Sequence, residues 1–249
     1  MAIAVSDGSF AEGYGSAAWV LEGDNEVGRL SGKAIVPGLA SDQSAPRSKL
    51  TGLYSILLHA SHICDTHRIQ EGSLEVACNG LSALQAAFAD TDSFATDKPN
   101  FDLLGAIYTI HRKLPITTLP RHVKGHQDQH KSTLDRWEAL NVEMDAMAKD
   151  HIAIAKQQPR HHYIQHAPWS ISIQGRKITC SLQKSLYEHI HGSIANLYWE
   201  KKEGLSTEQM ESVHWEALSK ARRQSSMSRN RFVTKHIVGM CKVGKFMVC

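Results

Sequence analysis

Two polar side chains follow short apolar runs, where the end of a buried strand would hold them rigidly. Asp7 comes directly after the run at residues 1–6, and Asn79 comes after the run at residues 74–78. A carboxylate at the rim of a rigid central strand suits a metal ligand, although Asp-Gly is also a common turn. The pattern therefore predicts a polar site at one edge of a sheet.

A helical pair and a polar loop add candidates to this site. Asn141 and Asp145 are four residues apart, so their side chains share one face of a helix. The stretch from Lys124 to His130 is polar, and it contains His126 as a second histidine. A solvated loop histidine is at least as good an interpretation of either histidine taken singly.

Hydrophobic periodicity predicts the elements that position these residues. Strands are expected at residues 1–6, 15–21, 32–36, 74–78 and 116–124, and helices at residues 47–62, 82–88, 101–113 and 134–155. This order predicts an α/β fold, with a mixed five-stranded sheet flanked by helices.

The chain changes character after residue 155. Residues 156–168 are predicted to form a linker, and residues 169–249 a hairpin plus a mainly helical basic extension. Gln174-Gly175 suits the turn of the hairpin, because glycine accepts positive φ. Helices are expected at residues 183–202 and 207–224. The predicted domains are therefore residues 1–155 and 169–249.

Five short motifs in order resemble type 1 ribonuclease H, in the version found at the end of retroelement polymerase polyproteins. The motifs are Ser6-Asp7-Gly8-Ser9, Arg47-Ser48-Lys49-Leu50-Thr51-Gly52-Leu53, Ala77-Cys78-Asn79-Gly80, Val123-Lys124-Gly125-His126 and Asn141-x-x-x-Asp145. The resemblance covers roughly residues 1–155. It implies a ribonuclease H-like fold, an RNA/DNA hybrid as substrate, and a mobile histidine, His126 or His130, near the leaving group. Ser9, Lys124 and Asn141 are then expected to contact nucleic acid.

The resemblance also implies a metal centre, from which this chain departs. In that family four carboxylates hold two Mg²⁺ ions that clamp the scissile phosphate. Asp7 and Asp145 match two of the four positions, but Lys49 and Asn79 stand at the others. The formal charge of the side chains falls from −4 to −1. At about 4 Å and an effective dielectric constant of about 20, one pair of unit charges is worth roughly 4 kcal/mol. We therefore expect one Mg²⁺ ion or none, and impaired nuclease activity.

Several alternatives stay open at this stage. The long stem of Lys49 could carry its ammonium group to solvent, which would leave the site short of one ligand. The domain could be a binding-only module, with Lys49 in the place of a cation, or a decayed element without a selected role. An integrase-type nuclease is disfavoured by Lys124-Gly125-His126 and by Asp145.

Charge is distributed unevenly along the chain. Residues 1–149 carry 13 basic and 18 acidic side chains, whereas residues 150–249 carry 15 and 7. Within the second part, Arg222, Arg223, Arg229 and Arg231 begin a basic stretch that is interleaved with Phe232 and Phe246. Such a stretch can follow a phosphate backbone, although a solvated basic face is an equally simple interpretation. Nucleic acid is therefore the expected partner.

Composition excludes several other classes of protein. The chain has 249 residues, of which 42% are hydrophobic and 21% charged, as in ordinary globular proteins. It lacks an apolar run of the roughly 20 residues that a membrane span needs, and the start of the sequence shows no signal-peptide core. Five cysteines without a C-x-x-C pair suggest reduced thiols. We therefore expect an intracellular protein, cytoplasmic or nuclear.

Overall fold

The computed structural model describes most of the chain. The described residues are 1–23, 28–89, 96–161, 164–204, 206–212, 214, 217, 220 and 223–231. They divide into two compact units, Met1–Tyr187 and Glu188–Cys249, and each is considered separately below.

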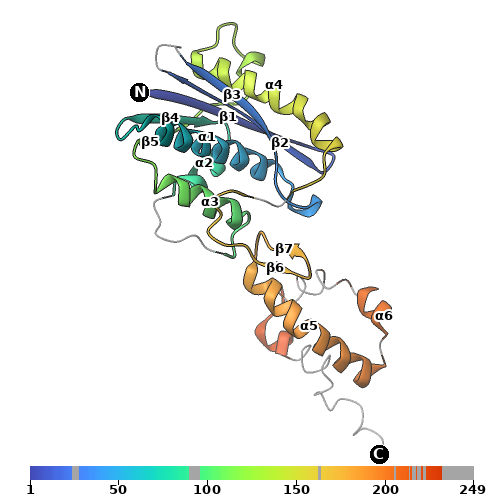
Figure 1. Cartoon of the computed structure of the whole chain (residues 1–249). Coiled ribbons are helices and arrows are strands. Elements are labelled where there is room, and N and C mark those ends of the chain that lie inside the picture. Colours follow the sequence, from blue (N-terminus) through green and yellow to red (C-terminus); the bar gives the residue numbers. More distant parts are fainter. Residues whose placement is uncertain are drawn as a thin grey trace, which may run out of the picture. The chain divides into compact units, whose positions relative to one another are not determined.

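The first unit is built around a five-stranded sheet of order β3-β2-β1-β4-β5 (Figure 1). The strands are β1 (Ala2–Ala11), β2 (Tyr14–Gly23), β3 (Arg29–Ile35), β4 (Ser73–Cys78) and β5 (Thr117–His122). The central strand β1 pairs antiparallel with β2 and parallel with β4, while β4 pairs parallel with β5. The predicted mixed five-stranded sheet is therefore confirmed.

Helices cover both faces of the sheet (Figure 1). They are α1 (Ala45–His67), α2 (Leu81–Ala87), α3 (Phe101–His111) and α4 (Arg136–Gln157), with short 3₁₀ helices η1 (Ala40–Asp42) and η2 (Gln127–Gln129). On one face, Met144 and Ala148 of α4 pack with Val5 and Val20 of the sheet. On the other face, the helices α1, α2 and α3 share a second apolar cluster with the sheet. The helices predicted between residues 47 and 155 are confirmed.

The chain beyond α4 forms shorter elements. The hairpin of β6 (Ser172–Ile173) and β7 (Arg176–Lys177) turns at Gln174 and Gly175, both with positive φ, as the sequence predicts. It is followed by α5 (Leu182–Glu203) and α6 (Thr207–Ser212). Part of the predicted helix at 207–224 lies outside the described residues.

The hairpin and the segment before it belong to the first unit. Ile164 is buried in the apolar cluster of α1 and α3, and the hydroxyl of Tyr54 donates to the carbonyl of Gln165 at 3.0 Å. The ammonium of Lys177 lies 3.0 Å from the carboxylate of Asp102 on α3. The boundary between the units therefore falls after residue 187, and it does not coincide with the predicted division at residues 155 and 168.

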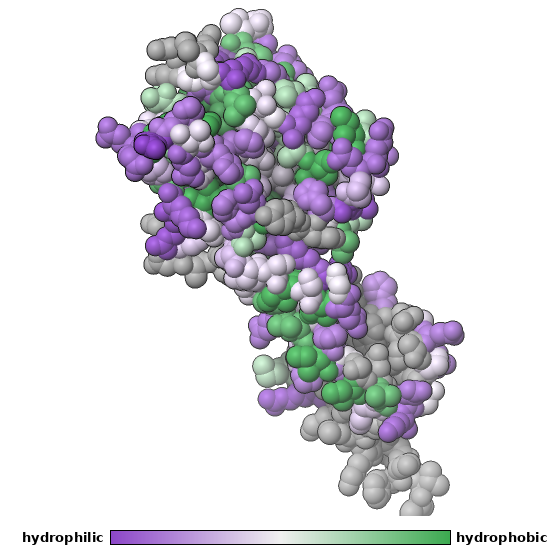
Figure 2. Space-filling view, in the orientation of Figure 1, coloured by the Kyte–Doolittle hydropathy of each residue, from purple (hydrophilic) through white to green (hydrophobic). Residues whose placement is uncertain are grey.

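Exposed apolar side chains lie along α5 (Figure 2). Leu186, Ile190, Ile194 and Leu197 are each more than one third exposed. No helix in the described part of the chain combines the length and the hydropathy needed to cross a bilayer. Among the described cysteines, Cys64 and Cys78 are buried and Cys180 is exposed, and all three are free thiols.

A buried ion pair fixes the start of α1. Both terminal nitrogens of Arg47 donate to the carboxylate of Asp102, at 2.9 and 2.8 Å, and its Nε donates to the carbonyl of Pro37. Arg47 is fully buried and Asp102 is 4% exposed. Burial alone would raise the pKa of Asp102, but the hydrogen bonds and charge of Arg47, joined by Lys177, outweigh it and lower that pKa. The pair holds the amino end of α1 in one position.

We predict that Asp102→Asn lowers the free energy of unfolding by about 3–5 kcal/mol, because it leaves Arg47 buried without its counter-charge. Since the folded-state pKa of Asp102 is depressed, its contribution is present above the unfolded-state pKa and is lost as the pH falls through the folded-state value. Urea unfolding at pH 7 and at pH 3 measures both effects.

A matched control uses an exposed acid of the same unit. Asp150 lies on the exposed face of α4, so Asp150→Asn should change stability by less than about 0.5 kcal/mol. Equal effects of the two substitutions would show that the buried pair does not stabilise the domain.

Candidate functional site

The site begins with Asp7 on the central strand. Asp7 is 2% exposed, and its Oδ1 accepts a hydrogen bond from the amide of Gly8 at 2.7 Å. Gly8 lies against α1 so closely that a Cβ there would meet backbone atoms of Ser48 and Lys49 at 2.3–2.4 Å. Only glycine allows this approach, which brings Lys49 next to the carboxylate of Asp7.

Lys49, Asp7 and Asn79 form a closed set of hydrogen bonds. The ammonium of Lys49 donates to Oδ1 of Asp7 at 2.8 Å and also to Oδ1 of Asn79. The amide nitrogen of Asn79 donates to Oδ2 of Asp7 at 2.7 Å. The side chain of Lys49 is 23% exposed, and Asp7 and Asn79 hold its ammonium instead of letting it extend away from them. The alternative in which Lys49 extends into solvent is therefore wrong.

The second carboxylate, Asp145, is also paired with a lysine. Its Oδ2 accepts from the ammonium of Lys149 at 2.6 Å, one turn further along α4. The hydrogen bond with Asp145 is the largest cause of a raised pKa of Lys149, to which the charges of Asp145, Asp7 and Asp128 add. Asp145 therefore has a lysine partner of its own, as Asp7 has Lys49.

A pair of Mg²⁺ ions does not fit this set of side chains. Two aspartates and two lysines give a formal charge of zero, and an ammonium already holds the oxygens of Asp7 and Asn79 that a metal would need. In the described parts of the chain, no group of three or more His, Cys, Asp or Glu side chains could hold a metal ion. A hard dication requires several oxygen ligands with net negative charge, which this arrangement does not provide.

The polar loop after β5 lies beside Asn79. A Cβ on Gly125 would lie 3.1 Å from the amide nitrogen of Asn79, and Nε2 of His122 is 3.3 Å from the carbonyl of Asn79. His126 has a positive φ, is exposed, and places its Nδ1 3.9 Å from Oδ2 of Asp145. His126 therefore lies near Asp145, and its predicted role near the leaving group stays a prediction.

Other predicted residues differ in how they are placed. Lys124 and His130 are exposed, and His130 ends the 3₁₀ turn η2. Ser9 is partly buried near the end of β1. Asn141 is 1% exposed, and its Oδ1 has no hydrogen-bond partner within the protein. Asn141 therefore lies inside the fold, and its predicted contact with nucleic acid stays a prediction.

The basic residues predicted near the end of the chain lie in the second unit. Arg223, Arg229 and Arg231 are exposed, as phosphate contacts would have to be. Arg222 lies outside the described residues. The prediction that these arginines bind nucleic acid stays a prediction.

Sequence reasoning missed Lys149. Its spacing of four residues from Asp145 is the signal that could have revealed it, because residues i and i+4 are neighbours on a helix. The close approach at Gly8 could not be recognised in the same way, since it depends on a helix that lies about 40 residues further along the chain.

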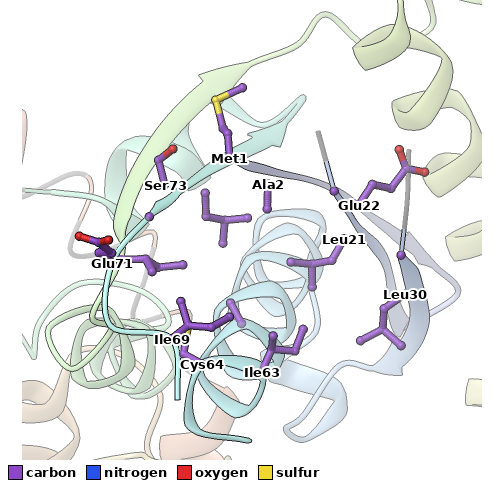
Figure 3. Close-up of a pocket in the computed structure, with 16 residues that line it drawn as sticks. Met1, Ala2, Leu21, Glu22, Leu30, Ile63, Cys64, Ile69, Glu71 and Ser73 are labelled. Atoms are coloured by element: carbon purple, nitrogen blue, oxygen red, sulfur yellow. The ribbon is translucent and has the colours of Figure 1, made fainter. Parts of the chain in front are cut away.

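An apolar hollow lies elsewhere in the first unit (Figure 3). It has a volume of about 360 Å³, and it is lined by residues at the amino ends of β1 and β4, among them Ala2 and Leu74. Asp7 and Asn79 lie toward the carboxyl ends of the same two strands. The hollow is therefore separate from the polar site.

The pairing of Asp7 with Lys49 predicts a measurable coupling energy. In a double-mutant cycle of Asp7→Asn and Lys49→Met, we expect a coupling of about 1–3 kcal/mol in urea unfolding, because the carboxylate is buried. The matched cycle of Asp145→Asn and Lys149→Met tests a pair whose lysine is 57% exposed, and about 0.3–0.5 kcal/mol is expected there. Equal couplings in the two cycles would contradict the buried pairing.

Comparisons with known proteins give structural similarities only. No protein-family model matches the sequence, and no curated protein matches it. The N-terminal RNase H domain of a Mycobacterium tuberculosis protein shares 12% identity and a TM-score of 0.44, over 63% of this chain and 96% of that one. A compost-derived LC11-RNase H1 was solved in complex with RNA/DNA hybrid. It is 13% identical to this chain, with a TM-score of 0.46, over 63% of this chain and 99% of that one. RNase H1 of Halobacterium salinarum is 15% identical, with a TM-score of 0.38, over 60% of this chain and 97% of that one.

Proposed function

We propose that the chain is a ribonuclease H-like protein of retroelement origin that binds RNA/DNA hybrid and whose nuclease activity is impaired. The carrying observation is that Asp7, Lys49 and Asn79, from three separate motifs, are joined by hydrogen bonds, while His126 of the loop after β5 lies 3.9 Å from Asp145. Residues far apart in a sequence converge in this way when a fold preserves a functional centre. The order of the strands and helices supports the same interpretation.

Binding of hybrid is supported by the resemblance of residues 1–155 and by exposed basic groups near the site. Proteins of this kind recognise the shape of the duplex, its phosphates and the 2′-hydroxyl groups of the RNA strand. Lys124 lies in the loop beside Asn79, and Lys149 is more than half exposed next to Asp145. Both can contact phosphate without changing the backbone. The retroelement origin rests on the motifs of the first unit, and on a resemblance of Trp169–Ile173 to the segment that follows the nuclease domain in some polyproteins.

Impairment of the nuclease follows from the charges at the site. Cleavage by two metals needs anionic ligands that hold one ion on the entering oxygen and one on the leaving oxygen. Here an ammonium group binds Asp7, and a neutral amide stands at the other position. A divalent cation would have to displace Lys49 and then approach its positive charge, so we propose that the site holds one Mg²⁺ ion weakly or none.

A binding-only module is the second candidate function. The pairing of the buried carboxylate of Asp7 with the ammonium of Lys49 favours it, because the ammonium offsets the negative charge that would repel an approaching phosphate. The two candidates differ only in whether slow cleavage remains.

Restoring the missing carboxylates tests the proposal. We predict that Lys49→Glu combined with Asn79→Asp raises the cleavage of RNA/DNA hybrid in Mg²⁺ by orders of magnitude, because the site then carries four carboxylates. The measurement follows the release of fragments from hybrid with end-labelled RNA, under single-turnover conditions.

The control adds Asp7→Asn to the double variant, which should return cleavage to the level of the unmodified chain. If the unmodified chain already cleaves hybrid at a rate comparable with that of the double variant, the proposed impairment is wrong.

A further inference from the structure

We propose that the ammonium of Lys49 itself binds a backbone phosphate of the nucleic acid, in the place of a metal ion. This inference rests on the proposed function, since it names how the same site would hold its partner. Lys49 would then contribute to binding directly, in addition to replacing a carboxylate.

Exposure decides which group a phosphate meets first. Asp7 is 2% exposed, whereas the side chain of Lys49, which donates to it, is 23% exposed. Of this pair, Lys49 is therefore the more accessible partner for a phosphate that arrives from solvent.

Hydrogen-bond capacity leaves room for that contact. An ammonium carries three N–H groups. Two of them serve Oδ1 of Asp7 and Oδ1 of Asn79. The third is available to an anionic oxygen, so binding a phosphate does not require Lys49 to release its partners.

The surrounding bonds also hold the ammonium in place. Oδ1 of Asp7 is fixed by the amide of Gly8 at 2.7 Å, and Oδ2 is fixed by the amide of Asn79 at 2.7 Å. Because the two acceptors of Lys49 are themselves fixed, the ammonium is preorganised, and little side-chain freedom remains to be lost when a phosphate binds.

The second carboxylate does not oppose the approach of an anion. Asp145, whose side chain is 22% exposed, is paired with Lys149, whose side chain is 57% exposed. Each site carboxylate is thus paired with a lysine ammonium, which offsets its negative charge toward an approaching anion.

This arrangement reverses the role of Asp7. In a site that binds phosphate through metal ions, removing an aspartate ligand weakens the complex. In a site that binds phosphate through Lys49, Asp7→Asn keeps an oxygen that can accept from the ammonium but removes the compensating negative charge, which strengthens the attraction between the ammonium and the phosphate. Whether Asp7→Asn weakens or strengthens binding therefore distinguishes a site that binds phosphate through metal ions from one that binds it through Lys49.

The test measures the binding of the full chain to a fluorescently labelled RNA/DNA hybrid by anisotropy, in EDTA and from 50 to 200 mM KCl. The unmodified chain should bind without divalent metal. Lys49→Gln should weaken binding about 3- to 10-fold. It should also make the fall of log K with log salt shallower by about one unit of slope, as expected for the loss of one phosphate contact. Lys49→Arg should bind within about twofold of the unmodified chain, and Asp7→Asn should bind more tightly.

The matched control removes an exposed lysine at the other end of the sheet. Lys113 precedes the amino end of β5, whereas Asn79 lies beyond the carboxyl end of the neighbouring strand β4. Lys113→Gln should therefore change the affinity for hybrid by less than about twofold. Urea unfolding curves of each variant establish that it is folded, and Lys49→Arg keeps the test meaningful if Lys49→Gln is unstable.

The outcomes separate this inference from the proposed function. Equal binding by Lys49→Gln and the unmodified chain, or weaker binding by Asp7→Asn, would overturn the role of Lys49 while leaving hybrid binding intact. A lack of hybrid binding by the unmodified chain, with and without Mg²⁺, would overturn the proposed function and this inference together. Binding only in the presence of Mg²⁺ would overturn the inference alone.

Discussion

The contact of one ammonium with one buried carboxylate determines what this site can do. Asp7 is almost inaccessible to solvent, and a buried carboxylate must be paired or protonated. In this chain the partner is Lys49, supported by the amide of Asn79. Because the ammonium already binds oxygens of Asp7 and Asn79, the proposed impairment of two-metal cleavage follows from the choice of Lys49 as partner.

The rest of the first unit positions this contact. Glycine at residue 8 lets α1 approach the central strand, and the buried pair of Arg47 and Asp102 anchors the amino end of that helix just before Lys49. Lys177 of the hairpin joins the same buried pair. The segment after α4 therefore contributes to the position of α1, although the sequence predicts it as part of a separate extension.

The elements of the first unit could be predicted from the sequence because each depends on local periodicity. The strand at residues 74–78 and the helix at residues 134–155 are examples. The direction of Lys49 could not be predicted in this way, since it depends on the distance between α1 and β1. The burial of Asn141 and the packing of the hairpin are likewise set by tertiary contacts between distant parts of the chain.

The most direct measurement is a crystal structure of the unmodified chain grown with Mn²⁺, in which anomalous scattering locates the metal. The account predicts no anomalous peak bridged by Asp7, and an ammonium of Lys49 within hydrogen-bond distance of Oδ1 of Asp7. Two ordered ions bridged by Asp7, with the side chain of Lys49 turned away from them, would contradict it.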